Sequence, residues 1–177
     1  YETGYRFKAK ERARIYLTNS LEPPSDIQAE LEVISPALAH EANAVNEIKR
    51  HKRFTVVIGN PPYSRVSRNK SEFILALLKD YKKPVADEPN QLPLVDDYIK
   101  VLRLAQHMQS SSGCGIIGFI TNHTIGSGIL FRGAREKFLG DQNLVKFTDL
   151  HGNSNIGERC PDDSKDENVF DIQAGVA

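Results

Sequence analysis

The chain has 177 residues, of which 40% are hydrophobic, and its 23 basic side chains balance 23 acidic ones. This length supports one globular domain with a real core, and the zero net charge leaves nucleic-acid binding to a local basic patch. The two cysteines, Cys114 and Cys160, lack a second pair at metal spacing, which argues against zinc and favours free thiols in a reducing cytoplasm. The apolar stretches are far shorter than the roughly 20 residues of a membrane span, so we expect a soluble protein with no membrane partner.

The first third of the chain is expected to hold two strands with a helix between them. Residues 15–18 suit a short strand, which Pro23 and Pro24 end. Residues 25–53 carry acidic side chains early and basic side chains late, as the helix dipole favours, and predict a helix. Residues 54–59 are a continuous apolar run with β-branched members, which is typical of a strand buried on both faces of a parallel sheet.

The rest of the chain is expected to alternate between helices and strands. Apolar residues at helical spacing predict helices at residues 72–81, 94–109 and 131–139. Apolar runs predict strands at residues 115–121, 144–150 and 169–177, and polar runs predict loops at residues 84–93 and 151–168. Strands separated by helices pair in parallel, so the order of elements predicts an α/β fold, a mostly parallel sheet with helices on both faces.

An Asn-Pro-Pro-Tyr sequence at residues 60–63 directly follows the first buried strand. Proline lacks an N–H group and fixes φ, so Pro61 and Pro62 end the strand and hold their carbonyl groups in a defined direction. Ligands of parallel α/β sheets bind beyond the carboxyl ends of the strands. Residues 60–63 are therefore predicted at the functional edge of the sheet, together with residues 121–123 and 151–153.

The residue types in this motif suit one kind of chemistry. The amino group of an aromatic ring is a poor nucleophile because its lone pair is delocalised. Two acceptors, Asn60 Oδ1 and the Pro61 carbonyl oxygen, could hold both of its N–H bonds and stabilise the positive charge that develops on nitrogen. Tyr63 offers a flat face on which an extruded base can stack. The competing interpretation is an ordinary strand end with a half-buried tyrosine, which leaves the agreement between residue types and position unexplained.

The Asn-Pro-Pro-Tyr motif resembles the catalytic motif of amino-methyltransferases that transfer a methyl group from S-adenosylmethionine to adenine in DNA. Longer strings resemble one branch of them, the type ISP restriction-modification enzymes. These strings are residues 15–21, 96–98, 118–123, 131–133, 149–154 and 164–173. The motif alone is shared with enzymes that methylate RNA adenines or protein glutamines, so the assignment to restriction-modification depends on the longer strings.

The resemblance implies a Rossmann-like methyltransferase fold, S-adenosylmethionine as cofactor, double-stranded DNA as substrate and a bacterial, cytoplasmic enzyme. It implies that Asn60 and Pro61 hold the target amino group, that Pro62 completes the motif, and that Tyr63 stacks on the flipped adenine. Phe170, at the start of the last predicted strand, matches the second base contact of the family. A plain core aromatic residue fits that position equally well.

We expect residues 1–177 to be the catalytic part of a methyltransferase domain within a longer parent chain. The first strands, the Gly-rich cofactor loop and the target-recognition region of the family have no counterpart in the sequence. A Gly-x-Gly-x-x-Gly pattern at residues 113–118 leads into a strand instead of following one, so it predicts a turn. The fragment alone is therefore expected to be inactive, or to act as a binding surface for the remaining domains of its parent.

Two basic clusters lie near the motif in sequence. Arg65, Arg68 and Lys70 follow it on the same edge and could contact DNA phosphates, or form an ordinary surface loop. Residues 49–53 precede the strand, so about 20 Å separates them from Asn60, and they predict a solvated helix end.

Two further groups of polar residues are expected to have structural rather than catalytic roles. Residues 161–165 hold two carboxylates and a lysine in one short loop, where they cannot converge on a metal ion, and they predict a solvated loop. His123 and His151 lie just past strands, with Asp149 near the latter. The proposed chemistry needs no general base, so we expect these histidines to fix loops.

Overall fold

The structure of the chain, a computed structural model, describes Gly4, Arg6, Lys8, Glu11 and residues 13–24, 35–63, 67–170 and 173–177. The chain divides into two compact units, Tyr1–Asn19 with Pro24–Lys52, and Ser20–Pro23 with Arg53–Ala177. All of the predicted site residues belong to the second unit. Among the described residues, no helix combines the length and the apolar character needed to cross a membrane.

The first unit contains one described helix, α2, at Pro36–His51. A proline near its first turn and three basic residues in its last turn suit the two ends of a helix, and Lys49 Nζ donates to the carbonyl of Asn19 at 2.8 Å. The helix predicted over residues 25–53 is confirmed for this part, while residues 25–34 lie outside the described residues. The strand predicted at residues 15–18 is wrong, since these residues are irregular and Ile15 and Leu17 are exposed, so no buried side chains hold them in a strand.

The second unit is built on a parallel pair of strands, β1 (Val56–Gly59) and β2 (Ile116–Phe119). Val56 pairs with Ile116 and Gly59 with Phe119. The chain passes between the strands through α3 (Glu72–Lys82), η1 (Lys83–Val85), η2 (Leu92–Val95) and α4 (Asp97–Ser110). Two parallel strands joined by helices make this an α/β fold, and the strands predicted at residues 54–59 and 115–121 are confirmed.

Local signals in the sequence place the helices of the crossover. The Ser71 side chain accepts the Ile74 N–H at 3.5 Å and caps α3, and the Asp96 side chain accepts the Tyr98 N–H at 3.4 Å and caps α4. The helices predicted at residues 72–81 and 94–109 are thus confirmed. The second begins three residues late, since Pro93 lies in the short 3₁₀ turn η2 that precedes the cap.

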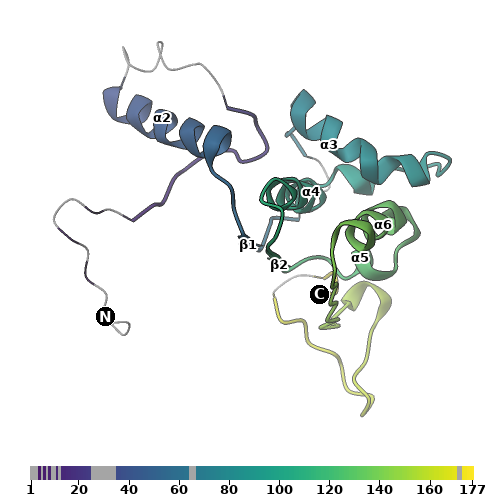
Figure 1. Ribbon diagram of the computed structural model, residues 1–177. Coiled ribbons are helices and arrows are strands. Elements are labelled where there is room, and N and C mark those ends of the chain that lie inside the picture. The colour runs from purple at the N-terminus through teal and green to yellow at the C-terminus, as the bar shows by residue number, and fades with distance from the viewer. Residues whose placement is uncertain are drawn as a thin grey trace. The chain divides into compact units, whose positions relative to one another are not determined.

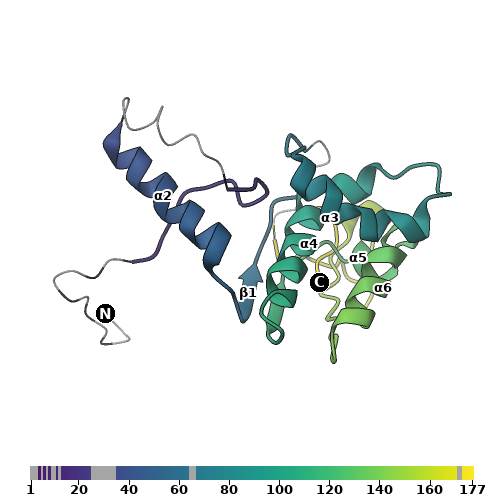
Figure 2. The ribbon, with the colours of Figure 1, turned by 45° about the horizontal axis from the view of Figure 1, so that its top comes forward.

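Helices α3, α4 and α6 (Arg132–Asp141) lie side by side in Figures 1 and 2. They pack around one apolar core. The core also takes in residues from α5 (Thr124–Ser127) and η3 (Ile129–Phe131). Its buried members are Leu78, Tyr81, Val85, Leu94, Tyr98, Ile99, Leu102, Ile125, Phe131 and Ala134. Ile117 and Phe119 of β2 pack against it, so one face of the sheet is covered by helices.

The opposite face of the two strands is open within this unit. Val56, Ile58 and Ile116 are 56%, 77% and 65% exposed, and they alternate with partly buried neighbours along each strand. The prediction that these strands are buried on both faces is therefore wrong within this unit. Apolar composition matched a strand of a parallel sheet, but burial requires a second layer that composition alone does not reveal.

The chain after α6 forms fewer regular elements than expected, with only η4 (Ser154–Ile156) among the described residues. The strand predicted at residues 144–150 is wrong, because this segment is irregular and its apolar residues are largely exposed, so no packing holds an extended conformation. The strand predicted at residues 169–177 is confirmed only at its end, where Val176 is completely buried and forms an antiparallel bridge with Asn122. The loop predicted at residues 151–168 is confirmed apart from that short turn.

Hydrogen bonds extend the sheet on the far side of β2, where Asn122 and Val176 form an antiparallel bridge. Residues 121–123 bond to residues 175–177, with Thr121 N donating to Ala177 O at 2.7 Å and His123 N donating to Gly175 O at 3.0 Å. Residues 175–177 bond in turn to residues 150–151, with Leu150 N donating to Val176 O at 2.8 Å. The chain segments therefore lie in the order β1, β2 and its extension, 175–177, then 150–151.

Candidate functional site

Asn60 is the first residue beyond the hydrogen-bonded ladder of β1. The Gly59 carbonyl accepts the Ile120 N–H at 3.0 Å, and the chain then leaves the sheet at the two prolines. Asn60 and Pro62 are exposed, whereas Pro61 is buried. Neither the Asn60 side chain nor the Pro61 carbonyl has a hydrogen-bond partner among the described residues, so both oxygens keep their full acceptor capacity.

Tyr63 is half-buried and packs against the helical core. Its ring meets the ring of Tyr98 on α4 edge to face, with centroids 5.6 Å apart and planes at 65°. Burial raises the pKa of the Tyr63 phenol, so it stays neutral at physiological pH. Its hydroxyl oxygen is buried and lacks a hydrogen-bond partner among the described residues. The ring is therefore anchored by its contact with α4 rather than by its polar atom.

The segment that follows the motif alternates between inward and outward residues. Ser67 is buried and Asn69 half-buried, while Arg68 and Lys70 are exposed. Neither Arg68 nor Lys70 pairs with an acidic group among the described residues, so both cations face solvent beside the motif. Arg65, the third predicted phosphate contact, lies outside the described residues.

His123 lies at the same edge, beyond β2, in a network of polar side chains. Its Nδ1 lies 3.6 Å from Asp149 Oδ2, and its Nε2 lies 3.0 Å from the side-chain nitrogen of the buried Asn153. Asp149 Oδ1 also accepts the backbone N–H of His151 at 2.9 Å, and this bond, followed by the charge of His123, lowers the pKa of the Asp149 carboxyl. These contacts agree with the expected role in fixing loops.

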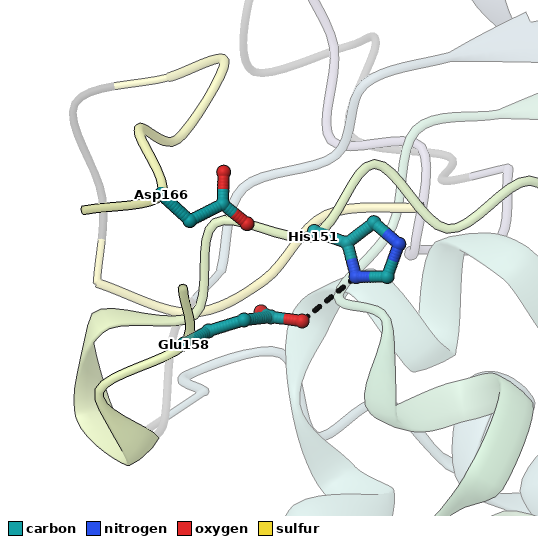
Figure 3. Close-up of side chains that lie close together, drawn as sticks. All are labelled: His151, Glu158 and Asp166. Carbon is teal, nitrogen blue, oxygen red and sulfur yellow. Dashed lines mark hydrogen bonds and ion pairs between the residues drawn. The ribbon is translucent and has the colours of Figure 1, made fainter. Parts of the chain in front are cut away.

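His151, Glu158 and Asp166 come together in the loop that follows, where Figure 3 shows their side chains converging. Their donor atoms lie within 4.8 Å of one another, and one nitrogen with two carboxylates could hold a divalent cation. The sequence analysis missed this group, because its members lie seven and eight positions apart in a loop and no periodic pattern marks them.

Each of these three side chains is already engaged within the loop. His151 Nδ1 lies 2.7 Å from Glu158 Oε1, and the second Glu158 oxygen accepts the Asn153 N–H at 2.9 Å. Asp166 Oδ2 accepts the Gly152 N–H at 3.1 Å. The bond to Glu158 raises the pKa of the His151 imidazole, and the Asn153 N–H lowers the pKa of the Glu158 carboxyl. The group therefore acts as a polar clasp for the loop.

This clasp lies too far from Asn60 to share its chemistry. Two chain segments stand between β1 and residues 150–151, and each strand spacing is about 4.8 Å, so roughly 14 Å separates them. A proton transfer requires hydrogen-bond reach. His151 is thus excluded as a base acting directly on a group held by Asn60.

Phe170 is half-buried in an irregular turn instead of a strand. Its backbone N–H donates to Asn168 Oδ1 at 3.0 Å, and Asn168 Nδ2 donates to the carbonyls of Gly152 and Ala174 at 3.1 and 2.6 Å. Asn168 therefore orders the turn in which Phe170 sits. None of the contacts among the described residues joins Phe170 to residues 60–63, and its base-contact role stays a prediction.

Three other segments behave as their sequences suggested. The glycines of residues 113–118 turn the chain from α4 into β2, and a Cβ at Gly115 would lie 2.3 Å from the Thr55 carbonyl oxygen. Residues 161–165 form an exposed loop in which the Asp162 side chain accepts from the Ser164 N–H and hydroxyl. Residues 49–53 include the last turn of α2.

Comparison with known proteins identifies the class of this α/β domain. Residues 6–156 match a family model described as Eco57I restriction-modification methylase. The match covers well over half of the sequence, and the chain belongs to this family of methylases. No curated protein matched.

Two of the solved structures that resemble the chain are Type ISP restriction-modification enzymes. The DNA-bound ATP-dependent Type ISP enzyme LlaBIII is 27% identical over 78% of this chain, with a TM-score of 0.56. DrdV in a DNA complex is 25% identical over 78% of the chain, with a TM-score of 0.58. A nuclease-deletion mutant of the Type ISP enzyme LlaGI, with a DNA substrate mimic, shares the fold, with 18% identity over 95% of the chain and a TM-score of 0.66. The chain spans only 10% to 14% of the length of these proteins.

Proposed function

We propose that this chain is the catalytic part of a domain that methylates the exocyclic amino group of adenine in DNA, within a restriction-modification protein. The observation that carries the proposal is the pair of acceptors at residues 60 and 61. They follow a parallel strand directly, at the edge where such sheets bind ligands, and they are not consumed by contacts with the described residues. The family and the Type ISP neighbours support DNA methylation as the reaction.

The chemistry assigned to this pair is electrostatic. Asn60 Oδ1 and the Pro61 carbonyl oxygen each accept one N–H of the amino group, which draws the nitrogen towards tetrahedral geometry. As the new N–C bond would form, the bond between the methyl group and its sulfonium donor would break and leave a neutral thioether. Positive charge then grows on nitrogen, and the two oxygens stabilise it until a proton leaves to solvent. In this role Pro61 and Pro62 act through rigidity, because each fixes φ and cannot donate a competing hydrogen bond.

We propose S-adenosylmethionine as the cofactor, which supplies the electrophilic methyl group. Among the described residues, no Gly-rich turn both follows a strand and opens a helix, the arrangement that binds such nucleotide cofactors. We therefore assign none of these residues to the cofactor. The domain is proposed to be Rossmann-like and to work with the other domains of its parent chain.

Double-stranded DNA is the proposed substrate, and the exposed cations beside the motif favour it. Arg68 and Lys70, both exposed, are proposed to contact phosphates next to an adenine that has left the helix, together with Arg65. Tyr63 is proposed to stack on the flipped base, with Phe170 as a second contact. The neighbouring LlaBIII and DrdV structures are complexes with DNA.

The test uses the full-length protein with methyl-labelled S-adenosylmethionine and, separately, duplex DNA, RNA and protein. Label at adenine in DNA supports the proposal, whereas label only in RNA or protein identifies a different substrate for the same acceptor pair. Asn60→Ala should abolish transfer and leave DNA binding intact. Asn143→Ala is the matched control, since Asn143 is another exposed asparagine, in the loop after α6. Activity surviving in Asn60→Ala overturns the assigned role.

A further inference from the structure

The first turn of α4 carries a charged pair that is unusually well buried. Lys100 is only 1% exposed, and its Nζ lies 3.8 Å from the half-buried Asp97. Burying two charges is costly unless their remaining hydrogen-bonding capacity is also filled. The groups that fill it therefore indicate what the pair holds in place.

Among the described residues, the hydrogen-bond partners of this pair belong to the segment that follows the motif. Asp97 Oδ1 accepts from the Ser67 hydroxyl at 2.5 Å and from Asn69 Nδ2 at 3.0 Å. Lys100 Nζ donates to the Ser67 hydroxyl and, at 2.5 Å, to the Asn69 carbonyl. The Asn69 N–H also donates to the Ser67 hydroxyl at 3.1 Å. Ser67 thus uses its one donor and both acceptor positions.

The same turn of α4 also holds the other end of the segment. Tyr98 lies between Asp97 and Lys100 in sequence, and its ring packs on that of Tyr63. Residues 63 and 67, on either side of the undescribed residues 64–66, are therefore both fixed to one helical turn. Ser67 is buried and Asn69 half-buried in this network, whereas Arg68 and Lys70 are exposed.

We propose that Asp97 and Lys100 are positioning residues for the Asn-Pro-Pro-Tyr segment. By fixing residues 67–69 on α4, they hold Tyr63 and the acceptors before it in one geometry and present Arg68 and Lys70 beside them. The catalytic part of this inference rests on the proposed function. Its structural part, an anchor that immobilises residues 67–70, stands without it.

The experiment compares Lys100→Met with Arg103→Met in the full-length protein. Arg103 is a matched control because it is a second buried cation on α4. It donates to the Leu77 carbonyl at 3.1 Å and to Asp80 at 2.7 Å, so it holds α3 and not the motif segment. The structural readout is the rate of trypsin cleavage after Arg68 and Lys70, followed by mass spectrometry under native conditions.

We expect cleavage at these two sites to become about tenfold faster in Lys100→Met and to stay within about twofold of wild type in Arg103→Met. Equal rates in wild type and Lys100→Met overturn the anchor. Should Lys100→Met fail to fold, Ser67→Ala replaces it, since loss of the central hydroxyl opens the same network without stranding a charge in the core. Unchanged cleavage in Ser67→Ala then contradicts the inference.

The catalytic readout is methyl transfer normalised to the folded fraction. Loss of the anchor should lower kcat about tenfold or more and leave KM for S-adenosylmethionine unchanged, and Lys100→Arg should recover part of the loss. A merely structural role would lower the folded fraction in both methionine variants and leave the normalised kcat unchanged. If wild-type protein transfers no methyl group to DNA, the proposed function fails, while the cleavage result still decides the anchor.

Discussion

The helical part of the second unit and the chain that follows α6 are held together by different forces. In the helical part, α3, α4 and α6 share an apolar core of ten buried residues. Beyond α6, apolar side chains such as Leu144, Phe147 and Val169 stay largely exposed. That region is ordered by hydrogen bonds and charges instead, among them the clasp of His151, Glu158 and Asp166.

Because different forces hold the two regions, pH and salt should affect their stability differently. Apolar burial does not depend on pH and responds weakly to salt, whereas a clasp of titratable groups on the surface responds to both. The acceptors at residues 60 and 61 belong to the first region through Tyr63 and α4. The residues around Phe170 belong to the second. Tyr63 and Phe170, the two residues proposed to contact the base, thus lie in different regions. A change that displaces one region relative to the other should therefore move them apart.

The largest expected effect comes from emptying the helical core. Leu78 on α3 is completely buried, so Leu78→Ala should destabilise this region by about 2–5 kcal/mol through lost burial and the cavity left behind. Leu139→Ala, at an exposed leucine of α6, should cost less than about 0.5 kcal/mol. Urea unfolding, with hydrogen exchange of the α3 and α4 peptides, measures both. Similar losses for the two variants would show that the core does not hold this region.

The next effect concerns the backbone of the second region. Gly152 has a φ of +77°, and a Cβ there would lie 2.6 Å from Asn168 Cα. Gly152→Ala should therefore loosen residues 151–168 by about 1–3 kcal/mol, because strain and a backbone collision act together. Gly157 shares a positive φ, of +64°, but nothing lies near its Cβ direction, so Gly157→Ala should cost only about 1 kcal/mol. Hydrogen exchange of the loop peptides compares the two, and α3 should be unaffected in both.

A smaller effect is expected from the unpaired hydroxyl of Tyr63. Tyr63→Phe keeps the ring contact with Tyr98 and removes a buried oxygen that has no partner among the described residues. The helical region should keep its stability or gain about 1 kcal/mol, and base stacking should survive. Tyr63→Ala should instead lose the ring contact and the stacking. A clear loss of stability in Tyr63→Phe, measured by urea unfolding, would mean that the hydroxyl has a partner in solution.

The smallest effect is the pH response of the clasp. The pKa of the His151 imidazole is higher in the folded loop than in the unfolded chain. The stability that its protonated form gives the loop is therefore complete below the unfolded pKa of about 6.5, and it is lost as the pH rises through the folded pKa. The pKa of the Glu158 carboxyl is lower in the folded loop than in the unfolded chain. The stability that its ionised form gives the loop is therefore complete above the unfolded pKa of about 4.5, and it is lost as the pH falls through the folded pKa.

Residues 151–166 should thus be best protected from hydrogen exchange between about pH 4.5 and 6.5, after correction for intrinsic exchange rates. The control is His151→Asn, because asparagine tolerates the positive φ of +59° but does not titrate. Its loop should lose the high-pH part of the response. A pH profile identical to wild type would show that His151 is not the titrating group.

The same division explains how far the sequence predicted the fold. Helices α3 and α4 were recognisable because an apolar stripe and a capping residue coincide, and β1 and β2 because apolar runs flank the crossover. The strand predicted at residues 144–150 did not form, because an apolar run becomes a strand only when a neighbouring layer covers it, and these side chains stay exposed. At residues 169–177 only the end extends the sheet, where Val176 is buried.

The candidate site was predictable only where adjacent residues carry the chemistry. Asn60 to Tyr63 could be found from residue types and from their place after a strand. The network of Ser67, Asp97 and Lys100 could not, since it joins residues 30 or more positions apart. Lys100 looks like an ordinary solvated lysine in a helix, and only the fold shows that another segment covers it.

The bare apolar face of β1 and β2 has a practical consequence for anyone who produces residues 1–177 recombinantly. Three large aliphatic side chains, Val56, Ile58 and Ile116, meet water there side by side. Exposed aliphatic surface of this kind associates with other apolar surface. The polypeptide should therefore self-associate as it is concentrated, even when each copy is correctly folded. A solubilising fusion partner, together with light scattering across a dilution series, belongs in any purification.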